Sequence, residues 1–360
     1  MAMAPFSNSP HPEKMATYEA DARLASIDAF LEAMTLPIPT ELPIQCTKQR
    51  TEFYARESYG KCYDHILELL LSKASQCVTV TGTLGVGKSM FLVYCFLRYR
   101  LENPAAGVQV EAYDRDSTKL HSGDIDGDVI TLVDGIPSSP PASNRWICFA
   151  SPNVSREDKM KNEHGHVELF LPIWDLDELQ VAADRLGLDE LLEPMTKEET
   201  AMCGTTIEAG PEYNSDGEDT IETRTFIFGF LPNTCLELDR SVLRAQFERL
   251  NAAIATVGHA KLQPLLWGDK SHQEQCDIVR HYFIPPTSST LDKYHVAIAS
   301  NYTRRMLVEN IVKMTMDERV YLEKKLLEHE EVEDIAQLVF KQRVFEMFAR
   351  GGTFQFHRLY

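Results

Sequence analysis

The residues with the clearest chemical use are three glycines, a lysine and a serine that stand close together. Glycines at this spacing let successive backbone N–H groups face a phosphate, while the lysine reaches the phosphate oxygens and the serine hydroxyl can ligate magnesium. The segment therefore predicts a site for ATP or another nucleoside triphosphate with Mg²⁺. Its residues match the pattern G-x-x-x-x-G-K-[ST] and are Gly82, Thr83, Leu84, Gly85, Val86, Gly87, Lys88 and Ser89.

A site of this kind needs an acid on the magnesium side, at the end of a neighbouring strand. Residues 129–133 read VITLV, as a buried strand does, and Asp134 follows them. We predict that Asp134 holds Mg²⁺ together with Ser89, and an Asp-Gly turn without metal is the alternative. Gly135 stands where many hydrolytic P-loop enzymes carry a glutamate base, which predicts slow hydrolysis.

Two further roles are assigned from position. The strand at 146–150 is followed by Ser151, Pro152 and Asn153, so Ser151 or Asn153 is predicted to orient the attacking water, with Ser151 taken as the candidate, although this is also a turn sequence. Fast phosphoryl transfer requires an arginine near the transferred group. The candidates, between which the sequence does not choose, are Arg56, Arg240, Arg304 and Arg305.

The predicted elements around the motif alternate between strand and helix. A β-branched strand at 77–81 precedes it and an apolar helix at 90–100 follows. Such alternation predicts an α/β fold, a P-loop NTPase core with a mostly parallel sheet, helices on both faces and a ligand site at the carboxyl ends of the strands. Further strands are predicted at 108–113, 129–133, 146–150 and 166–171.

Outside the sheet, helical periodicity dominates. Helices are predicted at 16–36 and 58–74 before the sheet, and at 174–186, 236–256, 273–282, 294–314, 318–329 and 332–349 after it, with a short strand near the C-terminus. The acidic, Gly/Ser-rich stretch between them is predicted to be a flexible insertion. The predicted organisation is an N-terminal tail and helix (1–45), the P-loop core (46–200), the insertion (201–224) and a helical lobe (225–360).

Composition narrows the class of protein. The 360 residues carry a formal net charge of −18, so there is no global positive field to attract a nucleic-acid backbone. The eight cysteines form no C-x-x-C pair, which favours reduced thiols and an intracellular protein. No secretory signal is recognisable, and the most apolar stretch, 90–97, is too short to span a membrane.

Five segments resemble, in order, the NTPase module shared by Crinkler effectors of oomycetes and fungi and the retrotransposon hot spot proteins of trypanosomes. The resemblance runs from about residue 45 to the C-terminus. The segments are FYARESY (53–59), GTLGVGKSMFLVYCFLRY (82–99), ITLVDG (130–135), LPIWDLDEL (171–179) and FEMFARGGTFQFHRL (345–359).

The resemblance implies an isolated ATP- and Mg²⁺-binding NTPase module, from an effector acting inside a host cell, in its cytoplasm or nucleus, and it is the one source of an expectation of nucleic-acid contact. Family members usually open the helical lobe with Gly-Gly-x-Pro-Arg, whose arginine is expected near the nucleotide. Here FGFLPN (228–233) stands instead, so that Asn233 replaces the arginine. This departure puts hydrolysis and nucleotide-state sensing in question.

Two function hypotheses follow. The first is a slow NTPase acting as a nucleotide-dependent switch, with a protein partner or a second copy bound through the helical lobe. The second is a non-hydrolysing interaction protein with a vestigial nucleotide pocket. A third, a metal-dependent nuclease, rests on the D-x5-E-x-K spacing of Asp317, Glu323 and Lys325 within an acidic helical run.

Overall fold

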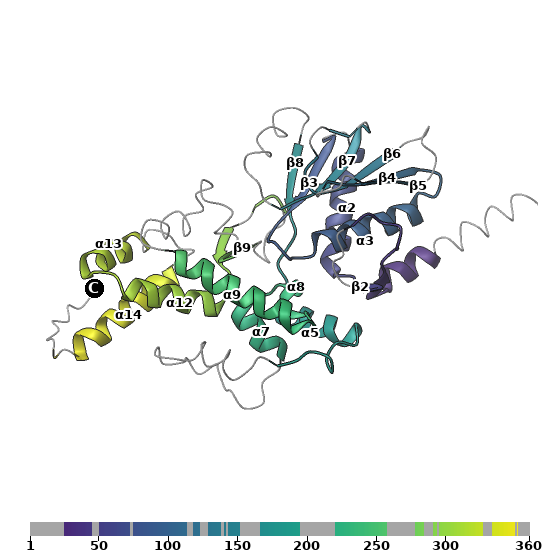
Figure 1. Cartoon of the computed structure of the whole chain (residues 1–360). Helices are drawn as coiled ribbons and strands as arrows, with labels where there is room; N and C mark the ends of the chain where they lie inside the picture. Colours follow the sequence, from purple (N-terminus) through teal and green to yellow (C-terminus); the bar gives the residue numbers. More distant parts are fainter. Residues whose placement is uncertain are drawn as a thin grey trace, which may run out of the picture. The chain divides into compact units, whose positions relative to one another are not determined.

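A six-stranded sheet carries the P-loop strand β3 (Cys77–Thr81) between two neighbours, in the order β5-β4-β6-β7-β3-β8 (Figure 1). In this computed structural model, the other strands are β4 (Gly107–Ala112), β5 (Thr118–Ser122), β6 (Val129–Asp134), β7 (Arg145–Phe149) and β8 (His166–Phe170). The residues that the structure describes are 25–44, 50–72, 75–113, 118–122, 129–137, 140–141, 143–151, 166–194, 220–257, 278–283, 291–293, 295–326, 333–349 and 351.

The sheet is mostly parallel, as predicted. β6 pairs in parallel with both β4 and β7. β3 is parallel to β7. The N–H of Trp146 donates to the carbonyl of Gln76, and the N–H of Ala150, four residues later, donates to that of Val80, also four residues later. All five residues of β3 are buried, which a strand covered on both faces requires.

The connection between β4 and β6 departs from the prediction. Helices were expected between some of the strands, but here the described residues form β5, which pairs antiparallel with β4. A polar run such as TKLHS lacks the apolar signal on which the strand assignments depended. The fold class is nonetheless the α/β P-loop fold that was predicted.

The chain divides into two compact units, Met1–Val78 with Ser89–Phe149 and Thr79–Lys88 with Ala150–Tyr360. We call these unit 1 and unit 2. The division passes through β3 and again between Lys88 and Ser89, so unit 2 includes most of the P-loop.

In unit 1, helix α2 (Glu57–Leu71) packs against α3 (Lys88–Glu102), and Figure 1 shows both beside the sheet. The ring of Tyr59 lies 5.0 Å from that of Phe91, which in turn meets Phe149 of β7 edge-on at 5.8 Å. Aromatic side chains therefore join both helices to the sheet.

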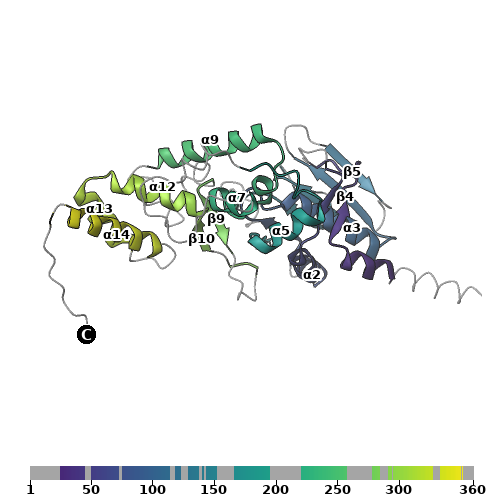
Figure 2. The same ribbon diagram turned by 90° about the horizontal axis from the view of Figure 1, so that it is seen from below.

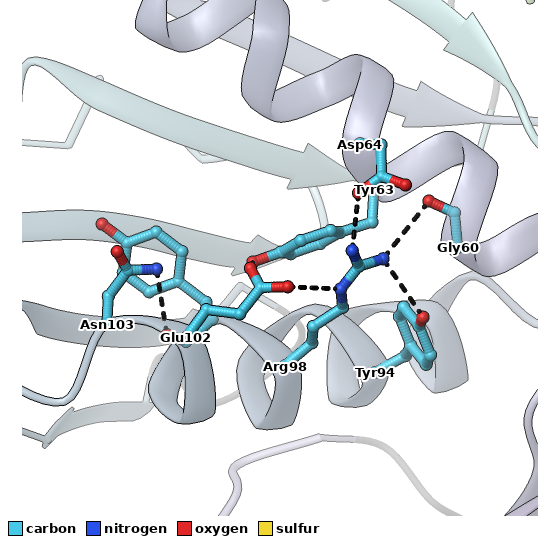
Figure 3. A network of polar contacts seen from close by, with 8 residues as sticks. Gly60, Tyr63, Asp64, Tyr94, Arg98, Glu102 and Asn103 are labelled. Atoms are coloured by element: carbon cyan, nitrogen blue, oxygen red, sulfur yellow. Dashed lines mark hydrogen bonds and ion pairs between the residues drawn. The ribbon is translucent and has the colours of Figure 1, made fainter. Parts of the chain in front are cut away.

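A buried arginine fixes α2 to α3 (Figure 3). Arg98 Nη2 is 2.6 Å from Asp64 of α2, its Nε is 2.8 Å from Glu102, and its guanidinium lies 4.3 Å from the centre of the Tyr63 ring. The Tyr63 hydroxyl donates to the second oxygen of Glu102 at 2.8 Å. Each nitrogen of the Arg98 guanidinium has a partner, which is the condition under which a buried charge is tolerated.

The start of unit 1 differs from the sequence prediction. The helix expected over 16–36 is helical in its described part at residues 25–32. It is followed by strand β1 (Thr35–Pro37), which pairs antiparallel with β2 (Glu52–Tyr54). Pro37 lacks the N–H that a helix would need. The absence of this N–H is tolerated at the end of a strand in a two-stranded sheet.

In unit 2, helix α12 (Asn301–Val312) is the centre of the helical part, and Figure 2 shows it between α9 and α14. Tyr302, Leu307 and Ile311 from α12 are fully buried in a core that Phe247 of α9 and Ile335 of α14 also enter. The remaining elements are α5 (Leu176–Arg185), α7 (Thr220–Phe228), α8 (Pro232–Cys235), α9 (Arg240–Thr256), α13 (Met316–Leu326), α14 (Glu333–Ala349), and the antiparallel strands β9 (Arg280–Phe283) and β10 (His295–Ile298).

Two helix predictions in unit 2 are wrong over part of their length. The sequence predicts helix at 280–282 and 295–298, whereas these residues belong to β9 and β10, and the rest of the second predicted helix contains α12. Runs of four residues do not distinguish strand from helix by periodicity alone. The predicted insertion is helical from Thr220, where α7 begins, and its residues 201–219 lie outside the described residues, as do the N-terminal tail and the predicted C-terminal strand.

Five cysteines of the described residues are buried thiols: Cys62, Cys77, Cys95 and Cys148 in unit 1 and Cys235 in unit 2. None of the described helices is both long enough and apolar enough to cross a bilayer.

Candidate phosphate-binding site

The P-loop joins the end of β3 to the start of α3. Its glycines Gly82, Gly85 and Gly87 have φ angles of 135°, 87° and 107°. Side-chain-bearing residues rarely adopt such angles, so these positions require the glycines that the sequence supplies. With this backbone, the loop turns directly into the N-terminus of α3, where the partial positive charge of the helix dipole favours an anion.

Lys88 points into the loop. Its Nζ donates to the carbonyl of Gly82 at 2.9 Å and to the carbonyl of Thr83 at 3.0 Å, all three residues belonging to unit 2. The ammonium is therefore held at the inner side of the loop, where phosphate oxygens could replace these carbonyls as its partners.

Ser89 and Asp134 face each other in unit 1. The Ser89 hydroxyl lies 3.2 and 3.3 Å from the two carboxylate oxygens of Asp134, the last residue of β6. Both are half-buried. A hydroxyl beside a carboxylate suits Mg²⁺, because this ion takes few protein ligands and completes its coordination shell with phosphate and water. No group of three or more His, Cys, Asp or Glu in the described part of the chain could hold a metal by itself.

Gly135 follows Asp134 and occupies the position where a glutamate could act as the catalytic base. Its φ is 92°, its N–H donates to Phe149 at 2.9 Å, and its carbonyl accepts from the thiol of Cys148 at 3.2 Å. A glutamate at this position would have to adopt a strained backbone. The backbone conformation at position 135, as well as the sequence, therefore disfavours a glutamate base there.

The other predicted residues lie as follows. Ser151 is exposed, two residues after β7 ends, and Asn153 lies outside the described residues. Arg240 pairs with Glu193 at 3.0 Å and Arg304 donates to Asn301 at 3.1 Å. Arg56 is buried with its guanidinium 5.9 Å from the Tyr59 ring, and Arg305 lies in α12.

Residues that follow the sheet in the sequence contact the P-loop, which the sequence did not predict. The indole N–H of Trp174 donates to Val86 at 2.8 Å, and the Thr83 hydroxyl accepts the backbone N–H of Tyr282 at 2.9 Å. Trp174 lies in one of the resembling segments, so the segment was noticed but not its contact. Nothing local marks a contact across 199 residues, which is the sequence separation between Thr83 and Tyr282.

Asn233, the residue that replaces the expected arginine, lies directly over the P-loop. A methyl group placed on Gly85 would overlap with the Asn233 side-chain amide. Asn233 follows Pro232 at the start of α8 and is itself exposed. The side chain at position 233 therefore lies against Gly85 of the loop.

A buried arginine keeps α8 in this position. Arg224 of α7 donates to the carbonyls of Cys235 at 3.1 Å, Glu237 at 2.6 Å and Glu193 at 2.8 Å. It is 1% exposed, and burial lowers the pKa of its guanidinium. The charge is thus satisfied mainly by backbone carbonyls at the end of α8.

Comparisons with known proteins find only weak similarities to solved structures. No protein-family model and no curated protein sequence matches the chain. Among solved structures, the chain is similar to the Thermotoga maritima RuvB Holliday junction branch migration motor, with 11% identity, TM-score 0.28, and coverage of 76% of this chain and 75% of that one. It is also similar to a structure of Drosophila ORC bound to DNA, with 12% identity, TM-score 0.29, and coverage of 99% and 84%. Similarities this low carry no argument about what the chain binds.

Proposed function

We propose that this protein is an ATP- and Mg²⁺-binding P-loop NTPase that hydrolyses slowly and acts as a nucleotide-dependent switch. The observation that carries the proposal is the loop itself. Its glycines adopt the required φ angles, and Lys88 Nζ is aimed at the loop interior. The next residue, Ser89, faces Asp134.

Each residue has a defined task in this proposal. The loop amides and Lys88 bind the phosphates, while Ser89 and Asp134 hold Mg²⁺. A metal held there would neutralise negative charge on the phosphates. No glutamate follows Asp134, and Asn233 stands where an arginine is expected, so binding is supported better than turnover.

Lys88→Ala is expected to weaken ATP binding in the presence of MgCl₂ by about 100-fold or more, because charge-assisted contacts contribute roughly 1.5–3 kcal/mol each. Isothermal titration of the full chain measures it. Lys61→Ala is the matched control, since Lys61 is exposed and pairs with Glu57 one turn away. No saturable binding by the wild type, or equal binding by Lys88→Ala, would refute the proposal.

Trp174→Phe is expected to lower ATP affinity by about three- to tenfold, the usual net worth of one hydrogen bond. The phenyl ring keeps most of the buried packing but leaves the Val86 carbonyl without its donor. Trp146→Phe, the same replacement at a buried position in β7, serves as the control. Equal affinities of the two variants would show that Trp174 does not position the loop.

The finer identity that we propose is an effector NTPase of the Crinkler and retrotransposon hot spot type, supported by the five ordered segments. Intracellular action in a host, a protein partner or self-association through residues 225–360, and any nucleic-acid contact belong to this proposal alone. Fluorescence anisotropy with labelled duplex DNA, with and without ATP, tests the last point. Salt-insensitive or absent binding would remove nucleic acid from the list of partners.

A second candidate is an interaction protein that binds nucleotide without turnover. Gly135, held at φ 92°, and Asn233 over the loop favour it. A phosphate-release assay separates the two candidates. Release above that of Lys88→Ala establishes hydrolysis, whereas equal release combined with tight ATP binding establishes the second function.

A further inference from the structure

The second residue of the P-loop is bonded to a strand far along the chain. Thr83 is 2% exposed, and its hydroxyl accepts the N–H of Tyr282 at 2.9 Å and lies 3.5 Å from the carbonyl of the same residue. Strand β9 is thus joined to the loop through its backbone. The Thr83 hydroxyl thus contacts both backbone polar groups of one residue, and a small movement of β9 or of the loop changes these contacts.

Thr83 is also bonded to the cation of the site. Lys88 Nζ donates to its carbonyl at 3.0 Å and to that of Gly82 at 2.9 Å. A phosphate group competes with these neutral carbonyls for the ammonium, and charge-assisted bonds to phosphate are the stronger ones. Phosphate binding therefore changes the contacts of the residue that holds β9.

From Tyr282 the contacts continue into the helical part. The Tyr282 ring lies 5.8 Å from that of Phe170, and Tyr282 pairs with Val296 of β10. Two residues after β10 ends, Ser300 caps α12, and its hydroxyl donates to the carbonyl of Ile227 at 2.7 Å. The whole route lies within unit 2.

We propose that the Thr83–Tyr282 hydrogen bond transmits occupancy of the phosphate site to the β9–β10 pair and to the start of α12. The inference rests on the proposed nucleotide binding and names its regulatory output. Continuity of contacts is not in itself coupling, so a difference between two states must be measured. The exchange of Lys88 between loop carbonyls and phosphate supplies the differential contact that such a shift requires.

Hydrogen exchange read by mass spectrometry tests the proposal on the full chain, without nucleotide and with saturating ATP and MgCl₂. In the wild type, ATP is expected to change amide exchange in the peptides that cover 279–283 and 295–303. In Thr83→Val, exchange of the Tyr282 amide is expected to be faster by about tenfold without nucleotide and to lose its response to ATP, since one buried hydrogen bond is worth roughly that factor. Thr83→Ser, which keeps the hydroxyl, should retain the response.

Thr81→Val is the matched control. The Thr81 hydroxyl is buried and has no hydrogen-bond partner among the described residues, so its loss should leave the response intact. Affinity is measured for every variant, and each is compared at its own saturation. ATP binding with unchanged exchange at β9 and β10, or a response that survives in Thr83→Val, overturns the inference alone. Failure of the wild type to bind ATP overturns the proposed function and this inference with it.

Discussion

Asn233→Arg is expected to raise the rate of ATP hydrolysis by at least about tenfold and up to about 10³-fold, within the range that a transition-state arginine contributes in enzymes that depend on one. Asn233 lies against Gly85, so a guanidinium at this position is expected to reach the phosphates that the loop binds. Ground-state affinity rests on the loop amides, Lys88 and magnesium and should change little. Phosphate release under saturating ATP measures the effect.

The control for this gain is Asn144→Arg, the same change at an exposed position just before β7. It should leave turnover unchanged. Two results would contradict the assignment of position 233. One is wild-type turnover that is already fast. The other is turnover unmoved by Asn233→Arg but abolished by Arg304→Ala, which would place the arginine in α12.

Arg224→Met is expected to lower the free energy of unfolding by about 3–5 kcal/mol, because each buried carbonyl left without its donor costs about 1–3 kcal/mol. The methionine fills much of the space, but three carbonyls lose their donor, two of them at the end of α8. Urea unfolding followed by circular dichroism measures the loss. Affinity for ATP should fall less than stability, because the P-loop keeps its own glycine geometry.

Arg240→Met provides the comparison, since Arg240 also bonds Glu193 but is about half exposed. Exposed ion pairs contribute roughly 0–1 kcal/mol, so this variant should unfold close to the wild type. Equal losses in the two variants would show that the three carbonyls find other partners without Arg224.

The parts that could be predicted from sequence are those that local patterns specify. β3 was placed at its exact bounds because a β-branched run precedes a glycine turn, and α3 because an apolar helix follows. The Ser89–Asp134 pairing followed from the rule that parallel strands end at the same edge. These inferences need only neighbours in sequence or one rule of topology.

What could not be predicted depends on distant contacts. The strands β9 and β10 are short, and their pairing gives each of them its identity as a strand. The position of Asn233 depends on Arg224, whose buried guanidinium donates to backbone carbonyls near the end of α8. Every residue has such a carbonyl, so the sequence does not indicate which of them Arg224 bonds. The family resemblance singled out position 233, because Asn233 replaces the arginine of the family motif. The contact of Asn233 with the P-loop is visible only in the fold.

The buried thiols make the protein its own reporter of local opening. Burial raises the pKa of Cys62 and of Cys235 to about 12, so neither is reactive while its surroundings stay closed. Alkylation at these sites must wait for the chain around them to open, and its rate then measures how often that happens. Because Cys62 belongs to unit 1 and Cys235 to unit 2, labelling followed by peptide mapping would time the opening of each unit separately, with no engineered probe.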